Sequence, residues 1–137
     1  MNILIVDGQG GGLGRQTVAA VKKRFPDSQV TAVGTNSAAT AAMLKAGADQ
    51  GATGENSVTV CAGKADVIIG PVGMVIADSL LGEITPAMAA AIGRSPAKRI
   101  LIPVNICDNI VVGVPDLSMG VLVDCVIAEL DKIRSSS

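Results

Sequence analysis

Short apolar runs rich in Val and Ile alternate along the chain with longer segments that carry apolar residues on one face only. Nearly continuous apolar runs are typical of strands buried on both faces of a parallel sheet. A three-to-four-residue apolar spacing is typical of amphipathic helices. The strand-like runs are residues 2–7, 30–33, 66–70 and 99–103, and the helix-like segments are residues 13–25, 37–46, 74–81, 85–93 and 118–133. The alternation predicts an α/β fold with a doubly wound parallel sheet, a Rossmann-like three-layer α/β/α arrangement.

Capping residues mark several of the expected helix ends. Ser37 is expected to be the N-cap of an alanine-rich helix that Gly47 stops. Thr85, followed by Pro86 at the first helical position, begins another helix, which Gly93 ends. These signals place helix starts directly after predicted strands or loops, as a βαβ alternation requires.

The middle and the end of the chain fit more than one assignment. Residues 51–53 predict a very short strand, whereas residues 55–62 are compatible with a helix or, through Val58-Thr59-Val60, with a strand; the helix is the preferred interpretation. Residues 109–114 are expected to add one further strand. No repeat or interdomain linker is visible, so we expect a single Rossmann-like domain over residues 1–134 and a frayed tail at residues 135–137.

Composition narrows the function classes. The chain has 137 residues, 49% of them apolar, which suits one compact core. Its 11 basic and 12 acidic side chains give a net charge of -1, so a broad basic face for nucleic acid is not expected. The sequence contains no His, Tyr or Trp, which excludes an imidazole base, an imidazole metal ligand and a phenolic acid.

The remaining composition points to a cytoplasmic protein that associates with itself. Cys61, Cys107 and Cys125 form no C-x-x-C pair, so reduced thiols are expected and no metal site is. No basic segment followed by an apolar one opens the chain, and charges interrupt the apolar stretch 71–93, so neither a signal peptide nor a membrane span is expected. The mean hydropathy of +0.52 is high for a small chain and favours a homo-oligomer.

The most informative motif is the glycine-rich segment 7–15, which follows a predicted strand and opens a predicted helix. Gly8, Gly12 and Gly14 fit a G-x-x-x-G-x-G spacing, whereas a G-x-G-x-x-G register meets Leu13 or Arg15 where glycine is needed. Such glycines let a phosphate approach the backbone at a helix N-terminus. No Lys stands where a G-x-x-x-x-G-K-[ST] loop needs one, so an ATPase or GTPase of that type is disfavoured.

Ligands of open α/β sheets bind beyond the carboxyl ends of the strands, and the residues there predict the site. The expected ligand-binding residues are Gly8, Gln9, Gly10, Gly11, Gly12, Leu13, Gly14, Arg15, Thr35, Asn36, Ser37, Gly70, Pro71 and Asn105. The second strand ends in neutral residues, without the acid typical of an NAD site, and only Arg15 is placed to meet the 2′-phosphate of NADP. The sequence therefore predicts a small phosphate-bearing ligand, a nucleotide or dinucleotide, with NAD and NADP both still candidates. Helix capping by residues 35–37 and a ligand-free packing turn are the structural alternatives.

Two resemblances add to this interpretation. The loop from Gly8 to Arg15 resembles the nucleotide-binding turn of the short-chain dehydrogenase/reductase superfamily, whose catalytic Tyr has no counterpart in this chain. The whole chain resembles a small bacterial family catalogued as a domain of unknown function, through the segments 8–12, 34–37, 52–56, 69–71, 82–85 and 102–105. The first resemblance implies nucleotide binding without the dehydrogenase chemistry, and the second implies no activity.

Few residues are candidates for catalysis. Glu55 and Glu83 are placed to act as a general base, although solvated or capping roles are the commoner use of such residues. Asp7 is expected to have a structural or sugar-facing role, and Asp78 to lie on a solvated face. Cys107 is the one thiol in a position to act as a nucleophile, but without a His base it is expected to pack. Three functions follow: a binding or regulatory module, an oxidoreductase, isomerase or lyase, or an interaction protein that uses the apolar region 74–92.

Overall fold

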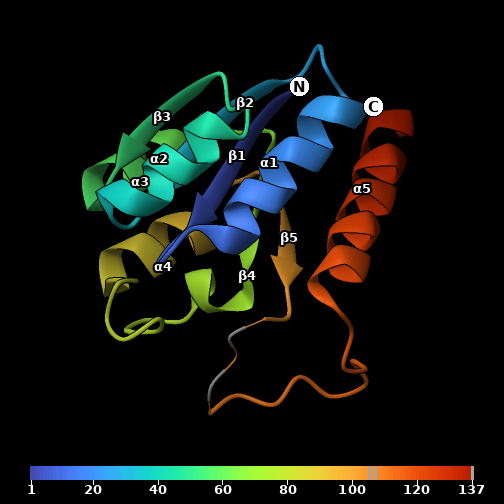
Figure 1. Cartoon of the computed structure of the whole chain (residues 1–137). Helices are drawn as coiled ribbons and strands as arrows, with labels where there is room; N and C mark the ends of the chain where they lie inside the picture. Colours follow the sequence, from blue (N-terminus) through green and yellow to red (C-terminus); the bar gives the residue numbers. More distant parts are fainter. Residues whose placement is uncertain (105, 107, 137) are drawn as a thin grey trace.

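Five parallel strands form one sheet in the order β3-β2-β1-β4-β5. The structure is a computed structural model and describes residues 1–104, 106 and 108–136 (Figure 1). The strands are β1 (Asn2–Asp7), β2 (Gln29–Gly34), β3 (Gln50–Thr53), β4 (Val67–Pro71) and β5 (Lys98–Ile102). The helices are α1 (Gly12–Arg24), α2 (Ser37–Lys45), α3 (Glu55–Ala62), the short 3₁₀ helix η1 (Val72–Val75), α4 (Pro86–Arg94) and α5 (Met119–Ser135).

Two layers of helices cover the sheet because successive strand residues point to opposite faces. Ile3 and Ile5 of β1 join a core with α1, α2 and α5. Leu4 and Val6 join a second core with α3, η1 and α4. Figure 1 shows α1 and α5 side by side, and these two helices are in contact. The predicted doubly wound α/β/α fold is confirmed.

Most of the expected elements are present, including the short third strand and the helix at residues 55–62. The helix expected at residues 74–81 is wrong: η1 ends at Val75, and turns follow. Asp78, Leu80 and Leu81 have φ angles of 66°, 55° and 56°. This left-handed conformation is incompatible with a right-handed helix, although the apolar spacing of the segment resembles one.

The strand expected at residues 109–114 is also absent, and β5 pairs with β4 alone. Ile110 and Val112 are 89% and 92% exposed. The sequence of this segment suits a strand, but a strand needs a neighbour, and none of the described strands pairs with it.

Two helix ends differ from the sequence-based expectation. Asn36 and not Ser37 caps α2, since Asn36 Oδ1 accepts a hydrogen bond of 2.9 Å from the Ala39 N–H. α5 runs to Ser135, so the first residue of the tail that was expected to fray is helical. No helix in the described part of the chain has both the length and the apolar character that crossing a membrane requires.

The central strands approach one another closely at Gly70 of β4. A Cβ atom added there would lie 2.6 Å from the carbonyl oxygen of Val6 and 2.6 Å from Met74 Sδ. The Val6 oxygen belongs to the backbone of β1 and cannot move aside without disturbing the sheet. Gly70 is therefore required for close packing at the centre of the fold.

We expect Gly70→Ala to destabilise the fold by about 1–3 kcal/mol, the usual cost of overpacking a core. Gly93→Ala is the matched control, because a Cβ on Gly93 of α4 would meet no atom within 4 Å. That control is expected to stabilise the fold by about 0.5–1 kcal/mol through helix propensity. Urea denaturation measures both free energies of unfolding. Equal stability of Gly70→Ala and the native chain would contradict the assigned packing role.

Candidate functional site

The candidate site lies where the chain reverses its direction of winding across the sheet. β1 and β4 are neighbours, and the connections that follow them cross opposite faces of the sheet. Ligands of open α/β sheets bind at this switch point, outside the carboxyl ends of the strands. The loop between β1 and α1, the residues after β2 and the segment between η1 and α4 meet at this edge.

Asp7, the last residue of β1, holds the glycine loop from beneath. Its Oδ1 accepts a hydrogen bond of 2.8 Å from the Gly8 N–H, and its Oδ2 accepts one of 2.6 Å from the Gly14 N–H. The side chain is buried, and this burial raises the pKa of Asp7 above its ordinary value, opposed by the two N–H donors. Asp7 thus ties both ends of the loop to β1. Of the two roles expected for Asp7, structural or sugar-facing, these contacts correspond to the structural one.

The outer face of the loop is open. The Gly11 N–H donates to Gly8 O at 3.0 Å, and Gly11 has a φ of 75° that favours glycine. Among the described residues, no acceptor bonds the N–H groups of Gly10, Gly12 and Leu13. A Cβ on Gly10 or Gly12 would meet no atom within 4 Å. The first turn of α1 therefore keeps unsatisfied donors beside open space.

Glu83 closes the neighbouring side of the loop. Its Oε1 accepts hydrogen bonds from the Gln9 N–H at 2.9 Å, Thr35 Oγ1 at 2.6 Å and Asn36 Nδ2 at 2.8 Å. The hydrogen bond from Thr35 and those from Gln9 and Asn36 lower the pKa of Glu83 below its ordinary value, against a smaller effect of burial. Glu83 is therefore ionised at neutral pH, and it is a weaker base than an ordinary glutamate.

The segment between η1 and α4 carries Glu83 to this place. The Asp78 N–H donates to Ile84 O at 2.8 Å, and Ser79 Oγ donates to Gly73 O, so the segment folds back on itself. Leu80 is buried in the second core, which anchors the bend. The only sequence signal for this arrangement was the glycine beside Glu83, at Gly82, which has a φ of 87°.

The structure gathers part of the predicted site. Residues 8–15, Thr35, Asn36 and Glu83 lie together at the carboxyl edge. Gly70 and Pro71 are buried, which gives them a packing role, and Ser37 is exposed on α2. Asn105 and Cys107 lie outside the described residues.

The other candidate acids do not join the loop. Glu55 is exposed in the first turn of α3, where it accepts a hydrogen bond of 2.7 Å from Thr85 Oγ1. Asp78 is exposed, as expected, although it lies in a turn and not on a helix. Among the described residues, no group of three or more Cys, Asp or Glu side chains could hold a metal ion.

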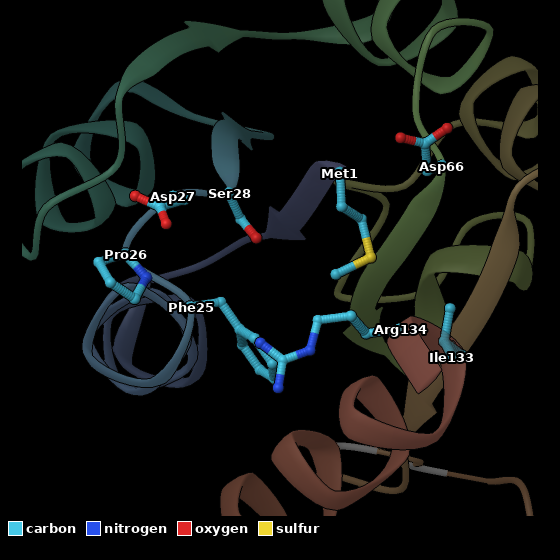
Figure 2. A pocket seen from close by; sticks show the side chains of 8 residues that line it. All are labelled: Met1, Phe25, Pro26, Asp27, Ser28, Asp66, Ile133 and Arg134. Atoms are coloured by element: carbon cyan, nitrogen blue, oxygen red, sulfur yellow. The ribbon is translucent and has the colours of Figure 1, made fainter. Parts of the chain in front are cut away.

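A hollow of about 610 Å³ lies at the other end of the strands, where their amino ends meet (Figure 2). Its lining includes Met1, Ser28 and Asp66, which precede β1, β2 and β4. Figure 2 shows the Arg134 guanidinium against the Phe25 ring, at 4.7 Å from the ring centroid. The hollow lies at the amino ends of the strands, away from the glycine loop, and its lining residues were not expected from the sequence.

One comparison with known proteins places the chain in a family. A family model described as "Domain of unknown function (DUF3842)" matches residues 2–135. No curated protein and no solved structure matches the chain. The likeness of the glycine turn to short-chain dehydrogenases/reductases therefore remains a resemblance of one loop.

The opposite pKa shifts at the site allow a test by pH. Because the pKa of Glu83 is lowered on folding, Glu83 stabilises the fold above its ordinary value of 4.5, and this contribution is lost as the pH falls. We expect the native chain to lose more stability than Glu83→Gln between about pH 5 and about pH 3. Urea denaturation across this range measures the difference. Burial raises the pKa of Asp7, which has the opposite sign, and the Glu83 charge adds to that shift, so Glu83→Gln removes only the Glu83 part of it.

Asp49→Asn provides a comparison away from the site. The Val30 N–H and Lys22 lower the pKa of Asp49, so this variant should also flatten the loss of stability in acid. The two substitutions share no partner, and their effects should add in the double variant. Parallel pH curves for Glu83→Gln and the native chain would show that folding does not lower the pKa of Glu83.

Proposed function

We propose that this chain, which belongs to the DUF3842 family, binds a small phosphate-bearing ligand of the nucleotide class at the N-terminus of α1. In this proposal the protein is a binding or regulatory module. The observation that carries the proposal is that the N–H groups of Gly10, Gly12 and Leu13 have no acceptor among the described residues, beside open space at the two glycines. A helix N-terminus with free N–H groups and no side-chain cap favours an anion.

The charges around the loop limit where a phosphate fits. Asp7 is buried beneath the loop, where two N–H donors bind its oxygens. Glu83 bonds the Gln9 N–H, so its negative charge disfavours a phosphate on that side. The exposed Arg15 lies in the first turn of α1, on the helix whose free N–H groups would meet the ligand. We therefore expect the phosphate beside Gly10 and Gly12.

Several observations favour binding over catalysis by a carboxylate. The pKa of Glu83 is lowered by its three donors, which is the wrong direction for a general base near neutral pH. Glu55 is exposed and lies in a different hydrogen-bonded pair, with Thr85. An oxidoreductase in which the cofactor carries the chemistry is the remaining enzyme hypothesis, and NAD and NADP belong in the ligand screen for this reason.

Gly12→Ala tests the proposed phosphate position. A methyl group on Gly12 enters open space, so the fold should keep its stability, while the ligand loses close access to the backbone. We expect binding to weaken by about tenfold or more. The screen measures thermal shift with nucleoside phosphates, NAD, NADP and sugar phosphates, since a ligand at 100 times its dissociation constant stabilises by about 2.7 kcal/mol. Calorimetry then gives the affinity.

Gly93→Ala on α4 is the matched control, with the same change of residue in equally open space. It should bind the ligand as the native chain does. A screen in which nothing shifts the native chain would overturn the proposed function, as would equal binding by Gly12→Ala and the native chain.

A second candidate function, self-association, is favoured by a different surface. The apolar region 74–92 was expected to form a contact, but Met74, Ile84 and Ile92 are fully buried in the second core. Leu81 is exposed in that region, but most of the large exposed apolar side chains lie between residues 110 and 121. They are Ile110, Val111, Val112, Val114, Leu117, Met119 and Val121.

We infer that a second copy of the chain covers this segment. Residues 108–117 carry two acids, Asp108 and Asp116, and no basic residue. β5 pairs with β4 on one side only, and its exposed first residues are Lys98 and Arg99. The acidic, apolar segment of one copy thus complements the basic, open strand edge of another.

Val112→Asp tests this association, because a charge in an apolar contact opposes burial. We expect the variant to have a smaller mass than the native chain in light scattering after gel filtration. Val60→Asp on α3 is the control, since Val60 is 46% exposed outside the segment. A native chain that is monomeric at high concentration, or a Val112→Asp oligomer of unchanged mass, would contradict the inference.

A further inference from the structure

Glu83 lies where a nucleotide-binding sheet of this strand order usually holds a ribose. In such sheets an acid at the end of the second strand accepts hydrogen bonds from the ribose hydroxyls. In this chain the residues after β2 are Thr35 and Asn36, which are neutral. The structure brings the carboxylate of Glu83 to the same place from a later part of the chain, and both neutral side chains bond it.

We propose that Glu83 recognises the 2′,3′-diol of a ribonucleotide through its second oxygen, Oε2. This inference rests on the proposed phosphate position at the N-terminus of α1. It names a ligand class, a nucleotide with an unsubstituted ribose, and it assigns to Glu83 a binding role in place of the catalytic role considered from the sequence.

The contacts of Glu83 leave one oxygen for a ligand. Three donors converge on Oε1, whereas no donor in the described chain bonds Oε2. The Glu83 side chain is only partly buried, so Oε2 is within reach of solvent or a ligand. A carboxylate fixed in advance by three hydrogen bonds loses little conformational freedom when it binds a second partner.

Thr35 and Asn36 have different roles beside it. Both polar atoms of the Asn36 side chain already form hydrogen bonds within the protein. Nδ2 donates to Glu83 and to Gln9 O, and Oδ1 accepts from the Ala39 N–H. Thr35 Oγ1 donates to Glu83 and keeps lone pairs that can accept from a hydroxyl. Glu83 Oε2 and Thr35 Oγ1 are thus two neighbouring acceptors, which suits two neighbouring hydroxyl donors.

The spacing of the strands fits one nucleotide. Asp7 and Gly34, the last residues of β1 and β2, are paired in register. Neighbouring strands lie about 4.8 Å apart, so the loop after β1 and the residues after β2 are separated by roughly the distance from a 5′-phosphate to its ribose. A phosphate beside Gly12 and a ribose beside Glu83 are therefore compatible with a single nucleotide.

The charge of Glu83 disfavours nucleotides that carry a 2′-phosphate. The lowered pKa of Glu83 keeps its carboxylate charged at neutral pH. A 2′-phosphate would place a second negative charge beside it, which is unfavourable in a partly buried site. NADP and other 2′-phosphorylated nucleotides are therefore expected to bind more weakly than NAD and nucleotides with a free diol.

The backbone of the Glu83 segment supports a positioning role. Leu80 and Leu81 both have left-handed φ angles, which residues other than glycine adopt only at an energetic cost. Leu81 is 97% exposed, so no burial of its side chain offsets that cost. Strain of this kind is commonly maintained where it holds a functional group in place.

The experiment compares ribonucleotides with their 2′-deoxy counterparts. Calorimetry of the native chain with the four nucleoside 5′-monophosphates and the four 2′-deoxy forms gives the preference for the diol. We expect the ribonucleotide that binds to do so about tenfold more tightly than its deoxy form, the value of one or two hydrogen bonds to a charged group. In Glu83→Gln this ratio should fall close to one, because an amide donor replaces one carboxylate oxygen, while the affinity for the deoxy form should change little.

A matched pair at Thr35 separates recognition from folding. Thr35→Ser keeps the hydroxyl and should keep the preference, whereas Thr35→Val removes it at similar volume and should reduce the preference. Urea denaturation of each variant shows whether the fold is retained. Folded variants with an unchanged ratio would overturn the role of the two side chains.

The remaining outcomes are also decisive. Equal affinity of the native chain for ribo and deoxy forms overturns the ribose assignment and leaves the proposed phosphate site intact. Tighter binding of all nucleotides by Glu83→Gln overturns it too, because Glu83 would then be an obstacle to the ligand. Absence of any nucleotide binding by the native chain is the failure of the proposed function itself, which the Gly12→Ala comparison addresses separately.

Discussion

The buried carboxylate of Asp7 is the constraint on which the rest of the candidate site depends. Burying an acid is unfavourable unless donors satisfy it, and the Gly8 and Gly14 N–H groups do so at 2.8 and 2.6 Å. These bonds join the end of β1 to the first turn of α1, so the path of the glycine loop is fixed before any ligand is present. Asp7 takes its donors from Gly8 and Gly14, and no acceptor in the described part of the chain bonds the N–H groups of Gly10 and Gly12.

Glu83 depends on this arrangement. The Gln9 N–H meets its carboxylate only because the loop turns at Gly8, where an added Cβ would lie 2.7 Å from Thr35 Oγ1. The loop, the end of β2 and the strained segment before α4 therefore form one hydrogen-bonded unit. Its residues come from three connections that the sheet order brings to one edge. The residues directly after β2 are neutral, and the folded chain places the negative charge of Glu83 beside them.

Most of the fold could be predicted from the sequence because local patterns determine it. Runs of Val and Ile predict the buried strands, one-sided apolar spacing predicts the helices, and caps such as Thr85-Pro86 predict where helices begin. Two predicted elements are wrong because contacts with distant parts of the chain, which local patterns do not show, decide the structure there. The apolar spacing of residues 74–81 matches a helix, but burial of Leu80 beside Gly8 selects a left-handed turn. Residues 109–114 match a strand that lacks a neighbour. The Glu83 site was hidden for a related reason, since its bond to Gln9 spans 74 residues.

The two acids at this edge show why the geometry favours recognition over proton transfer. Acid–base catalysis needs a group that a substrate can reach and whose pKa is near the working pH. The pKa of Asp7 is raised, but burial under the loop and two N–H bonds keep its oxygens from a ligand. Glu83 is within reach, but its pKa is lowered. The pKa of Asp7 is thus shifted toward neutral pH in a group out of reach, whereas the pKa of the group within reach, Glu83, is shifted away from it. Together they leave an edge with donors on the loop and a fixed acceptor beside it, which is the arrangement that the proposed phosphate and ribose would require.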